Sequence, residues 1–488
     1  RVDENGLVNY AEIIGGELVN CVSFDCADPA AVWNEGSGWS FSGGKAIYDG
    51  TGGTSPIAQS DVIEVGKTYR VSIEVLSNEG SGSNTLFLGG TILSTGNLSV
   101  GTHVFYGATS NSSVALTIYG RSGEVFEIGS FSAKEVTRDN VPRIDYTGGG
   151  CPHILAEPQR TNLIPYSEDF SQTDWQKIKS SVTSGFSSPD GGNNSYRWQE
   201  DTNSGVHSLK ESYSFTSVDY SQTIFIKPNG RSNVSLWVDG ASKGTRFDLS
   251  SGTIHSETSS VGKITAMNDG WFKISTTVLG TSGTAFNLYA LDNFGNISYT
   301  GDGTSGFYVY GAQLEVGSYP TSLIPTSGST VTRNQDIFTR DGIGSLINST
   351  EGVLFAEIQG FSNVNLQRII SLSDGSNNVN TVQLGILNST TNYKLFASVR
   401  VSSSFQAFMV YDLGAVEPTM VKAAIKYKEN DFSLWVDGVE RVTDTSGSTF
   451  SADTLNELAF DRGGGSQKFE GKVKQLQVYD TALTDEQL

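Results

Sequence analysis

Aromatic side chains beside polar loops are the residues of this chain whose types fit binding chemistry. A sugar presents apolar C–H faces that stack on aromatic rings, and its hydroxyls need amide, carboxylate or guanidinium partners. Trp435 is one candidate, because its neighbours Leu434 and Val436 occupy the opposite face of an alternating strand, which leaves Trp435 facing solvent or a groove. The other candidates are Trp39, Tyr48, Trp198, Tyr213, Tyr289 and Tyr299. Each ring also fits a core or its rim, and for any single residue we favour that interpretation.

Catalytic motifs are weak in this sequence. Nucleophilic catalysis needs a nucleophile, a base and an orienting group. The histidine bases are His103, His153, His207 and His255, and no G-x-S-x-G or H-E-x-x-H motif accompanies them. We interpret all four as satisfied surface histidines. The sequence does not exclude a catalytic pair of carboxylates, as in glycosidases, because the chain has 52 acidic residues. It nevertheless favours a protein that is not an enzyme.

Metal-binding patterns are similarly sparse. Asp302 in a Gly-Asp-Gly-Thr stretch and Asp374 in a Ser-Asp-Gly stretch have the residue types that Ca²⁺ takes, although Asp-Gly more often marks a turn. The chain requires no cofactor, and calcium stays open at these two positions. Cys21, Cys26 and Cys151 lack the spacing of a zinc site. Cys21 and Cys26 could bridge only if the short segment that they share folds back, and we expect all three thiols to be unpaired, as in a protein assembled in a reducing cytoplasm.

Charge and hydropathy exclude two classes of partner. The chain carries 52 acidic and 32 basic residues, for a net charge of −20. Without a basic stripe there is nothing to release counterions from a phosphate backbone, so we expect no nucleic-acid partner. No apolar run approaches the roughly 18 residues of a membrane helix, so we expect no membrane insertion.

The elements that must position these residues are β-strands. The 488 residues include 56 glycines, and long runs with helical period are absent. Residues 66–75 alternate with Tyr69, Val71, Ile73 and Val75 on one face, which is typical of a half-buried strand. Length and pattern together predict an all-β chain of about three antiparallel sandwiches. Four of the eleven prolines lie in residues 142–165, which predicts an extended, non-helical connector.

That connector carries a resemblance to a known family. It resembles the linker of tailed-bacteriophage virion proteins of the tail-fibre type. One segment upstream of the first domain and two segments at the exit from the second domain are similar to that family too. The segments concerned are Pro142–Tyr146, Glu157–Leu163, Ser167–Phe170, Arg1–Val8, Gly311–Ser322 and Thr330–Arg333. Residues 19–41 resemble the opening of jelly rolls of the carbohydrate-binding-module type. Residues 351–358, 423–440 and 469–487 resemble a concanavalin-A-like (laminin-G-like) sandwich, including its last strand and short terminal helix.

The resemblance implies an order of domains. Two jelly rolls, which we interpret as a tandem duplication, would precede one laminin-G-like sandwich, and Trp33, Trp175 and Trp271 would be core residues of the framework. The expected segments are an extended N-terminal arm (1–15), a jelly-roll sandwich (16–137), a Pro/Gly connector (138–165), a second jelly-roll sandwich (166–318), a Pro/Ser/Thr connector (319–340) and the laminin-G-like sandwich (341–488).

The function implied is that of a phage tail fibre or other surface-projecting virion protein that binds host-surface or environmental glycans. Its N-terminal end would contact other virion proteins, and it would form a homo-oligomer, with a trimer as a reasonable expectation for a fibre. It would be assembled in the host cytoplasm and exposed on the virion. Two alternatives stay open, namely a purely structural capsid or tail decoration protein and the carbohydrate-binding part of a secreted glycan-degrading enzyme.

Overall fold

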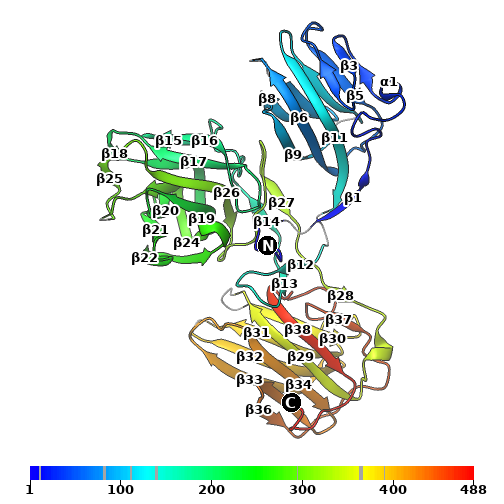
Figure 1. Ribbon diagram of the computed structural model, residues 1–488. Coiled ribbons are helices and arrows are strands. Elements are labelled where there is room, and N and C mark those ends of the chain that lie inside the picture. The colour runs from blue at the N-terminus through cyan, green and yellow to red at the C-terminus, as the bar shows by residue number, and fades with distance from the viewer. Residues whose placement is uncertain are drawn as a thin grey trace. The chain divides into compact units, whose positions relative to one another are not determined.

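The chain divides into two compact units (Figure 1). A computed structural model describes residues 1–9, 12–80, 84–109, 113–137, 141–293, 295–361, 366–389 and 391–488. One unit is Ala11–Val141, and the other joins Arg1–Tyr10 to Pro142–Leu488. Within the described residues, helix is confined to α1 (Pro29–Val32) and two 3₁₀ turns, and none of these has the length and apolar character that crossing a bilayer demands. The all-β prediction is confirmed.

The first unit is a two-sheet antiparallel sandwich. The predicted strand of residues 66–75 is β6 (Thr68–Glu79), and Tyr69, Val71, Ile73 and Val75 are buried on one face as expected. One sheet has the order β3 (Trp39–Phe41), β4 (Ala46–Tyr48), β11 (Val125–Thr137), β6 and β9 (Gly101–Ala108), with β1 (Ile13–Glu17) also on β11. The facing sheet has the order β2 (Asn34–Glu35), β5 (Ser55–Gln59), β10 (Leu116–Gly120), β7 (Asn84–Leu88) and β8 (Thr91–Gly96).

A disulfide in this unit corrects the prediction of three free thiols. Cys21 and Cys26 are bonded, with their Cα atoms 5.6 Å apart. The segment between them folds back because Cys21 and Phe24 both adopt positive φ, at 58° and 54°. Such φ values are uncommon outside glycine, and composition alone does not reveal them. Cys151 is an exposed free thiol.

The second sandwich belongs to the other unit. Its ten-stranded sheet turns from one layer into the next through two long paired strands, β19 (Ser208–Asn229) and β24 (Phe272–Ala290), whose register shifts at several points. The order is β16 (Ser180–Phe186), β17 (Ser195–Glu200), β26 (Gly306–Val316), β19, β24, β20 (Asn233–Asp239), β21 (Lys243–Asp248) and β22 (Thr253–Thr258). Strand β15 (Trp175–Ile178) pairs with β19, β23 (Ser260–Ala266) pairs with β24, and β18 (Ser204–Val206) pairs with β25 (Ser298–Thr300).

The first and second sandwiches each contain a framework tryptophan that packs against a phenylalanine in a similar way. Trp33 lies 5.3 Å from Phe24 between ring centroids, and Trp175 lies 4.9 Å from Phe170. Each indole Nε1–H donates to a backbone carbonyl that precedes it in the chain, Cys21 O for Trp33 and Tyr166 O for Trp175. Both side chains, and that of Trp271, are buried, which confirms their prediction as core residues.

The C-terminal sandwich encloses the largest apolar core. One sheet has the order β12 (Arg143–Asp145), β13 (His153–Ala156), β38 (Gly471–Tyr479), β29 (Glu351–Gly360), β34 (Val421–Lys428), β35 (Phe432–Val436) and β36 (Val439–Asp444). The other has the order β28 (Thr339–Arg340), β37 (Glu457–Ala459), β30 (Gln367–Ser373), β31 (Thr381–Asn388), β32 (Tyr393–Val401) and β33 (Ser404–Gly414). The predicted last strand is present as β38, but residues 482–484 have no regular structure and residues 485–487 form a turn, so the predicted terminal helix is wrong.

The described residues of the predicted connectors are non-helical, and they do more than join domains, since residues 147–151 turn the chain back between two paired strands. The hairpin of β12 and β13 adds two strands to the C-terminal sheet, because Ile154 to Ala156 pair with Val473 to Gly471. Strand β14 (Arg160–Asn162) pairs with β27 (Val331–Arg333) of the second connector. Residues distant in the sequence are therefore fixed side by side, which local proline spacing does not predict.

Candidate glycan-binding face of the second sandwich

A row of side chains crosses the outward face of five strands in the second sandwich. Lys210 of β19 stands opposite Asn287 of β24, Asn287 opposite Trp237 of β20, and Trp237 opposite Gly244 of β21. Gln176 of β15 extends the row on the other side of Lys210. Because residues directly opposite on neighbouring strands point to the same face, an indole, an amide and an ammonium lie next to one another.

Trp237 is held on this face by its strand and by a glycine. Leu236 and Val238, on either side of it, are fully buried in the core, so alternation turns Trp237 outward. Its ring lies against β21 at Gly244, where an added Cβ would stand 2.4 Å from the ring carbon Cε3. The indole is half-buried, and its supported position suits stacking on a sugar.

Polar side chains beside Trp237 form a network around the carboxylate of Asp239. The Tyr289 hydroxyl donates to Asp239 Oδ1 at 2.6 Å, and Asn287 Nδ2 donates to Oδ2 at 3.1 Å. Lys210 Nζ lies 3.1 Å from the same Oδ2. Burial and the Asp239 carboxylate raise the pKa of the Tyr289 hydroxyl, so it stays protonated and remains a donor. We call Lys210, Trp237, Asp239, Asn287 and Tyr289 the Trp237 face.

One atom of this network has spare hydrogen-bonding capacity. Asn287 is 2% exposed, and its Oδ1 has no hydrogen-bond partner among the described residues. A buried amide oxygen without a partner costs about 1–3 kcal/mol. The face thus combines a ring, a carboxylate and an ammonium, which are groups that a saccharide uses.

Four of the seven aromatic residues predicted from the sequence do not present a ring to solvent. Trp39 and Tyr48 pack together in the first sandwich, with ring centroids 5.2 Å apart, and Trp198 stacks on Phe307 in the second. The exposed fractions of Trp39, Tyr48, Trp198 and Trp435 are 6%, 0%, 1% and 8%. These predictions are corrected for Trp39, Tyr48 and Trp198, because a ring enclosed by its own core has no face for a sugar. The prediction for Trp435 is corrected because Leu483 and Leu488 pack over it.

The other three predicted aromatic residues are half-buried. Tyr289 belongs to the Trp237 face. Tyr213 packs edge-on against Phe215, 5.2 Å between ring centroids. Tyr299 lies under the guanidinium of Arg231, 4.8 Å from its ring centroid, and donates to Glu200 Oε2 at 2.7 Å. The structure therefore brings only Tyr289 of the predicted set into the row.

The two predicted calcium positions are turns. Asp302 Oδ1 accepts from the backbone N–H groups of Thr304 and Ser305, each at 2.7 Å. Asp374 Oδ1 accepts from Ser376 N at 2.9 Å. No group of three or more His, Cys, Asp or Glu side chains that could hold a metal ion occurs in the part of the chain that the structure describes.

One histidine corrects the surface interpretation. His207 is fully buried. Its Nδ1 lies 2.9 Å from the carbonyl oxygen of Lys179, and its Nε2 lies 3.3 Å from that of Tyr299. The ring also contacts Tyr299. His207 is therefore an interior residue, and its ring lies between two backbone carbonyl oxygens.

Sequence reasoning missed Trp237, although a signal was available. Residues 234–238 alternate, and the argument that turned Trp435 outward applies equally to Trp237. The hexapeptide Ser-Leu-Trp-Val-Asp-Gly occurs twice, at residues 235–240 and 433–438. The partners Lys210, Asp239 and Asn287 carried no comparable signal, because only strand register brings them together.

Comparisons with known proteins give limited likenesses. No family model matches the chain, and no curated protein matches it. The CBM40 of the Ruminococcus gnavus IT-sialidase bound to α2,3 sialyllactose is 17% identical to this chain, with a TM-score of 0.24. The match covers 31% of this chain and 96% of the CBM40 chain. The tandem CBM22-1–CBM22-2 domain of Paenibacillus barcinonensis Xyn10C is 12% identical, covers 64% and 100%, and has a TM-score of 0.21. Bacteroides ovatus xyloglucan PUL GH43B is 11% identical, covers 92% and 97%, and also has a TM-score of 0.21. Likenesses at this level carry no argument about ligand or reaction.

Proposed function

We propose that this chain is a non-enzymatic virion protein of a tailed phage, and that it binds host-surface or environmental glycans through the Trp237 face. The observation that carries the glycan part is the half-buried indole of Trp237 in direct register with Asn287, with Lys210 as the next residue in the row. The virion part rests on the resemblance of the connector segments to those of phage tail-fibre-type proteins.

The chemistry of the face supports saccharide binding over other small ligands. The apolar side of a pyranose ring would stack on the Trp237 indole. Its hydroxyls would donate to Asp239 and would accept from Lys210. Because Asp239 already holds Tyr289, Asn287 and Lys210 in place, little side-chain ordering remains to be done on binding.

Projection from a virion fits sites of modest affinity. A homo-oligomer, such as a trimer, would present several copies of the Trp237 face, and simultaneous binding would raise the overall avidity. Other virion proteins would hold the N-terminal end of the chain.

The test is binding of the purified protein to a glycan array, followed by titration calorimetry with the best ligand. Trp237→Ala should weaken the Kd by about tenfold or more, the equivalent of about 1.4 kcal/mol of lost stacking. Tyr479→Ala is the matched control, because Tyr479 is an aromatic residue of the C-terminal sandwich that is 37% exposed. It should leave the Kd unchanged.

Three results would contradict the proposal. If no glycan binds the folded protein, the decoration role remains and imaging of labelled particles would locate it. If Trp237→Ala binds as well as the wild type, the site lies elsewhere. Release of reducing sugar from a bound glycan by the purified chain would show an enzyme instead.

A further inference from the structure

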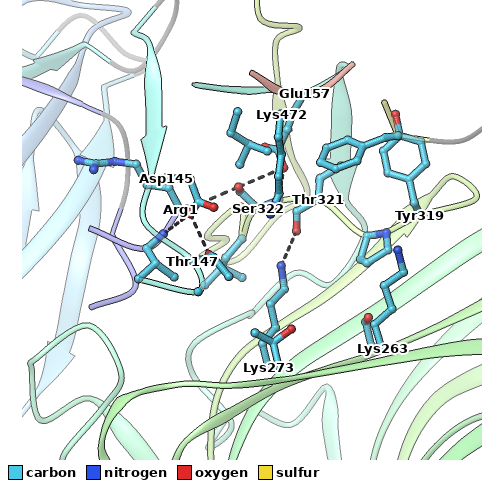
Figure 2. Close-up of a pocket in the computed structure, with 18 of the residues that line it drawn as sticks. Arg1, Asp145, Thr147, Glu157, Lys263, Lys273, Tyr319, Thr321, Ser322 and Lys472 are labelled. Carbon is cyan, nitrogen blue, oxygen red and sulfur yellow. Dashed lines mark hydrogen bonds between the residues drawn. The ribbon is translucent and has the colours of Figure 1, made fainter. Parts of the chain in front are cut away.

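A large cleft lies in the unit that contains the second and C-terminal sandwiches. Its volume is about 1470 Å³, which exceeds the roughly 300–1,000 Å³ of most small-ligand sites. One wall is the outward face of β23 and β24, and other walls come from the residues after β26 and from the C-terminal sandwich. Figure 2 shows Lys263 and Lys273 extending from the first wall towards Tyr319 and Thr321.

Strand register places the lysines on this wall. Lys263 of β23 pairs with Ser275 of β24, and Thr265 pairs with Lys273. All four residues line the cleft, while Ile274, between Lys273 and Ser275, is fully buried in the core. The ammonium of Lys273 donates to the carbonyl oxygen of Thr321 at 3.2 Å (Figure 2).

The charge of Lys273 is held in an unfavourable environment. Burial lowers the pKa of the Lys273 ammonium, the carboxylates of Glu157, Glu315 and Asp145 oppose this, and Lys472 makes a smaller contribution that lowers it. Lys472, from β38, is half-buried and also lines the cleft. Two cationic side chains thus share a partly desolvated space in a protein of net charge −20.

Three of the carboxylates near Lys273 already have polar or charged partners, and Asp3, Glu4, Asp219 and Glu417 also line the cleft. Glu157 Oε1 accepts from Ser322 N at 2.8 Å, and its Oε2 lies 3.0 Å from Arg333 Nη1. Glu315 accepts from the N–H and the hydroxyl of Thr321, at 2.8 and 2.6 Å. The oxygens of Asp145 are engaged by Val2 N, Thr147 Oγ1 and His153 Nε2. These carboxylates hold the connector segments together.

We propose that the cleft binds a carboxylate-bearing saccharide, with the carboxylate between Lys273 and Lys472. An anion there would offset the burial of Lys273 and its repulsion by Lys472. Ser275 and Gln359, which line the same space, supply partners for hydroxyl groups. The site stands apart from the Trp237 face, since Lys273 lies near the start of β24 and Asn287 near its end, so either site can fail without the other.

The experiment is titration calorimetry of the full chain with trigalacturonate, with maltotriose as the uncharged probe and sulfate as the simple anion. Trigalacturonate should bind and maltotriose should not bind at this cleft. Lys472→Gln should weaken the trigalacturonate Kd by about tenfold or more. Lys428→Gln is the matched control, because Lys428 does not line the cleft and is paired with Glu351 at 2.9 Å, and it should change the Kd by less than about threefold.

Lys472→Gln is the main variant because Lys472 is half-buried and its loss should leave the fold intact, which near-ultraviolet circular dichroism would check. The proposal is overturned if trigalacturonate gives no heat at millimolar concentration or binds Lys472→Gln as tightly as the wild type. If sulfate displaces trigalacturonate and binds as tightly, the cleft is an anion site that does not recognise the saccharide. Trp237→Ala should leave trigalacturonate binding unchanged, and a loss of it would assign that binding to the other face.

Discussion

Replacement of Glu211 by Gln should stabilise the second sandwich above neutral pH and have no effect in acid. Glu211 lies on β19 between Trp175 of β15 and Phe286 of β24. It is 6% exposed, and its Oε2 has no hydrogen-bond partner among the described residues. Burial, with a smaller contribution from the Asp174 carboxylate, raises the pKa of Glu211 from 4.5 to about 7.

The sign and size of the effect follow from that shift. Because the folded state binds the proton more tightly than the unfolded state, the stabilisation is complete below the unfolded pKa of 4.5 and is lost as the pH rises through about 7. The full shift corresponds to about 3 kcal/mol. The Gln variant carries no charge, so it should gain that amount over the wild type at about pH 8.

Urea unfolding followed by tryptophan fluorescence at several pH values measures this difference. Glu429→Gln is the control, since Glu429 is an exposed glutamate of the same unit and its replacement removes a surface charge only. A difference between Glu211→Gln and the wild type that stays flat from about pH 4 to about pH 8 would refute the assignment of Glu211 as a buried carboxyl with a raised pKa.

Two further predictions concern the face and the disulfide. Gly244→Ala should weaken glycan binding by about tenfold, because its Cβ would stand 2.4 Å from the Trp237 ring. Calorimetry would measure it, with Gly16→Ala as the control because nothing lies within 4 Å of a Cβ at Gly16. Reduction of the Cys21–Cys26 disulfide should lower the stability of the first unit by about 2 kcal/mol, measured as a fall in Tm, and an unchanged Tm would show that the bond constrains nothing.

Alternation of apolar residues predicted much of the fold. The burial of Tyr69, Val71, Ile73 and Val75 on one side of β6 follows from the two-residue period of a strand. The period says nothing about which strands become neighbours. The pairing of β13 with β38 joins residues more than 300 positions apart, so proline spacing predicted an extended segment but not its place in the C-terminal sheet.

The candidate site was less predictable than the fold. Tyr289 was among the expected residues, but its partner Asp239 lies 50 positions earlier in the chain. Trp39, Tyr48 and Trp198 are aromatic residues near polar loops that fill cores instead. Residue type alone does not separate a binding ring from a core ring, because both uses depend on the same apolar surface.

The repeated hexapeptide shows which features the local sequence determines and which the tertiary structure determines. In both copies, at residues 235–240 and 433–438, the sequence alone determines a strand that turns its tryptophan away from the adjacent core and ends at Asp-Gly. Only the tertiary structure decides whether that tryptophan meets solvent. Trp237 lies against Gly244 and remains half-buried. Trp435 is 8% exposed, because Leu483 and Leu488 pack in the same apolar cluster. Identical local sequence gives a candidate binding ring in one sandwich and a covered ring in the other, since exposure depends on chain segments far from the strand.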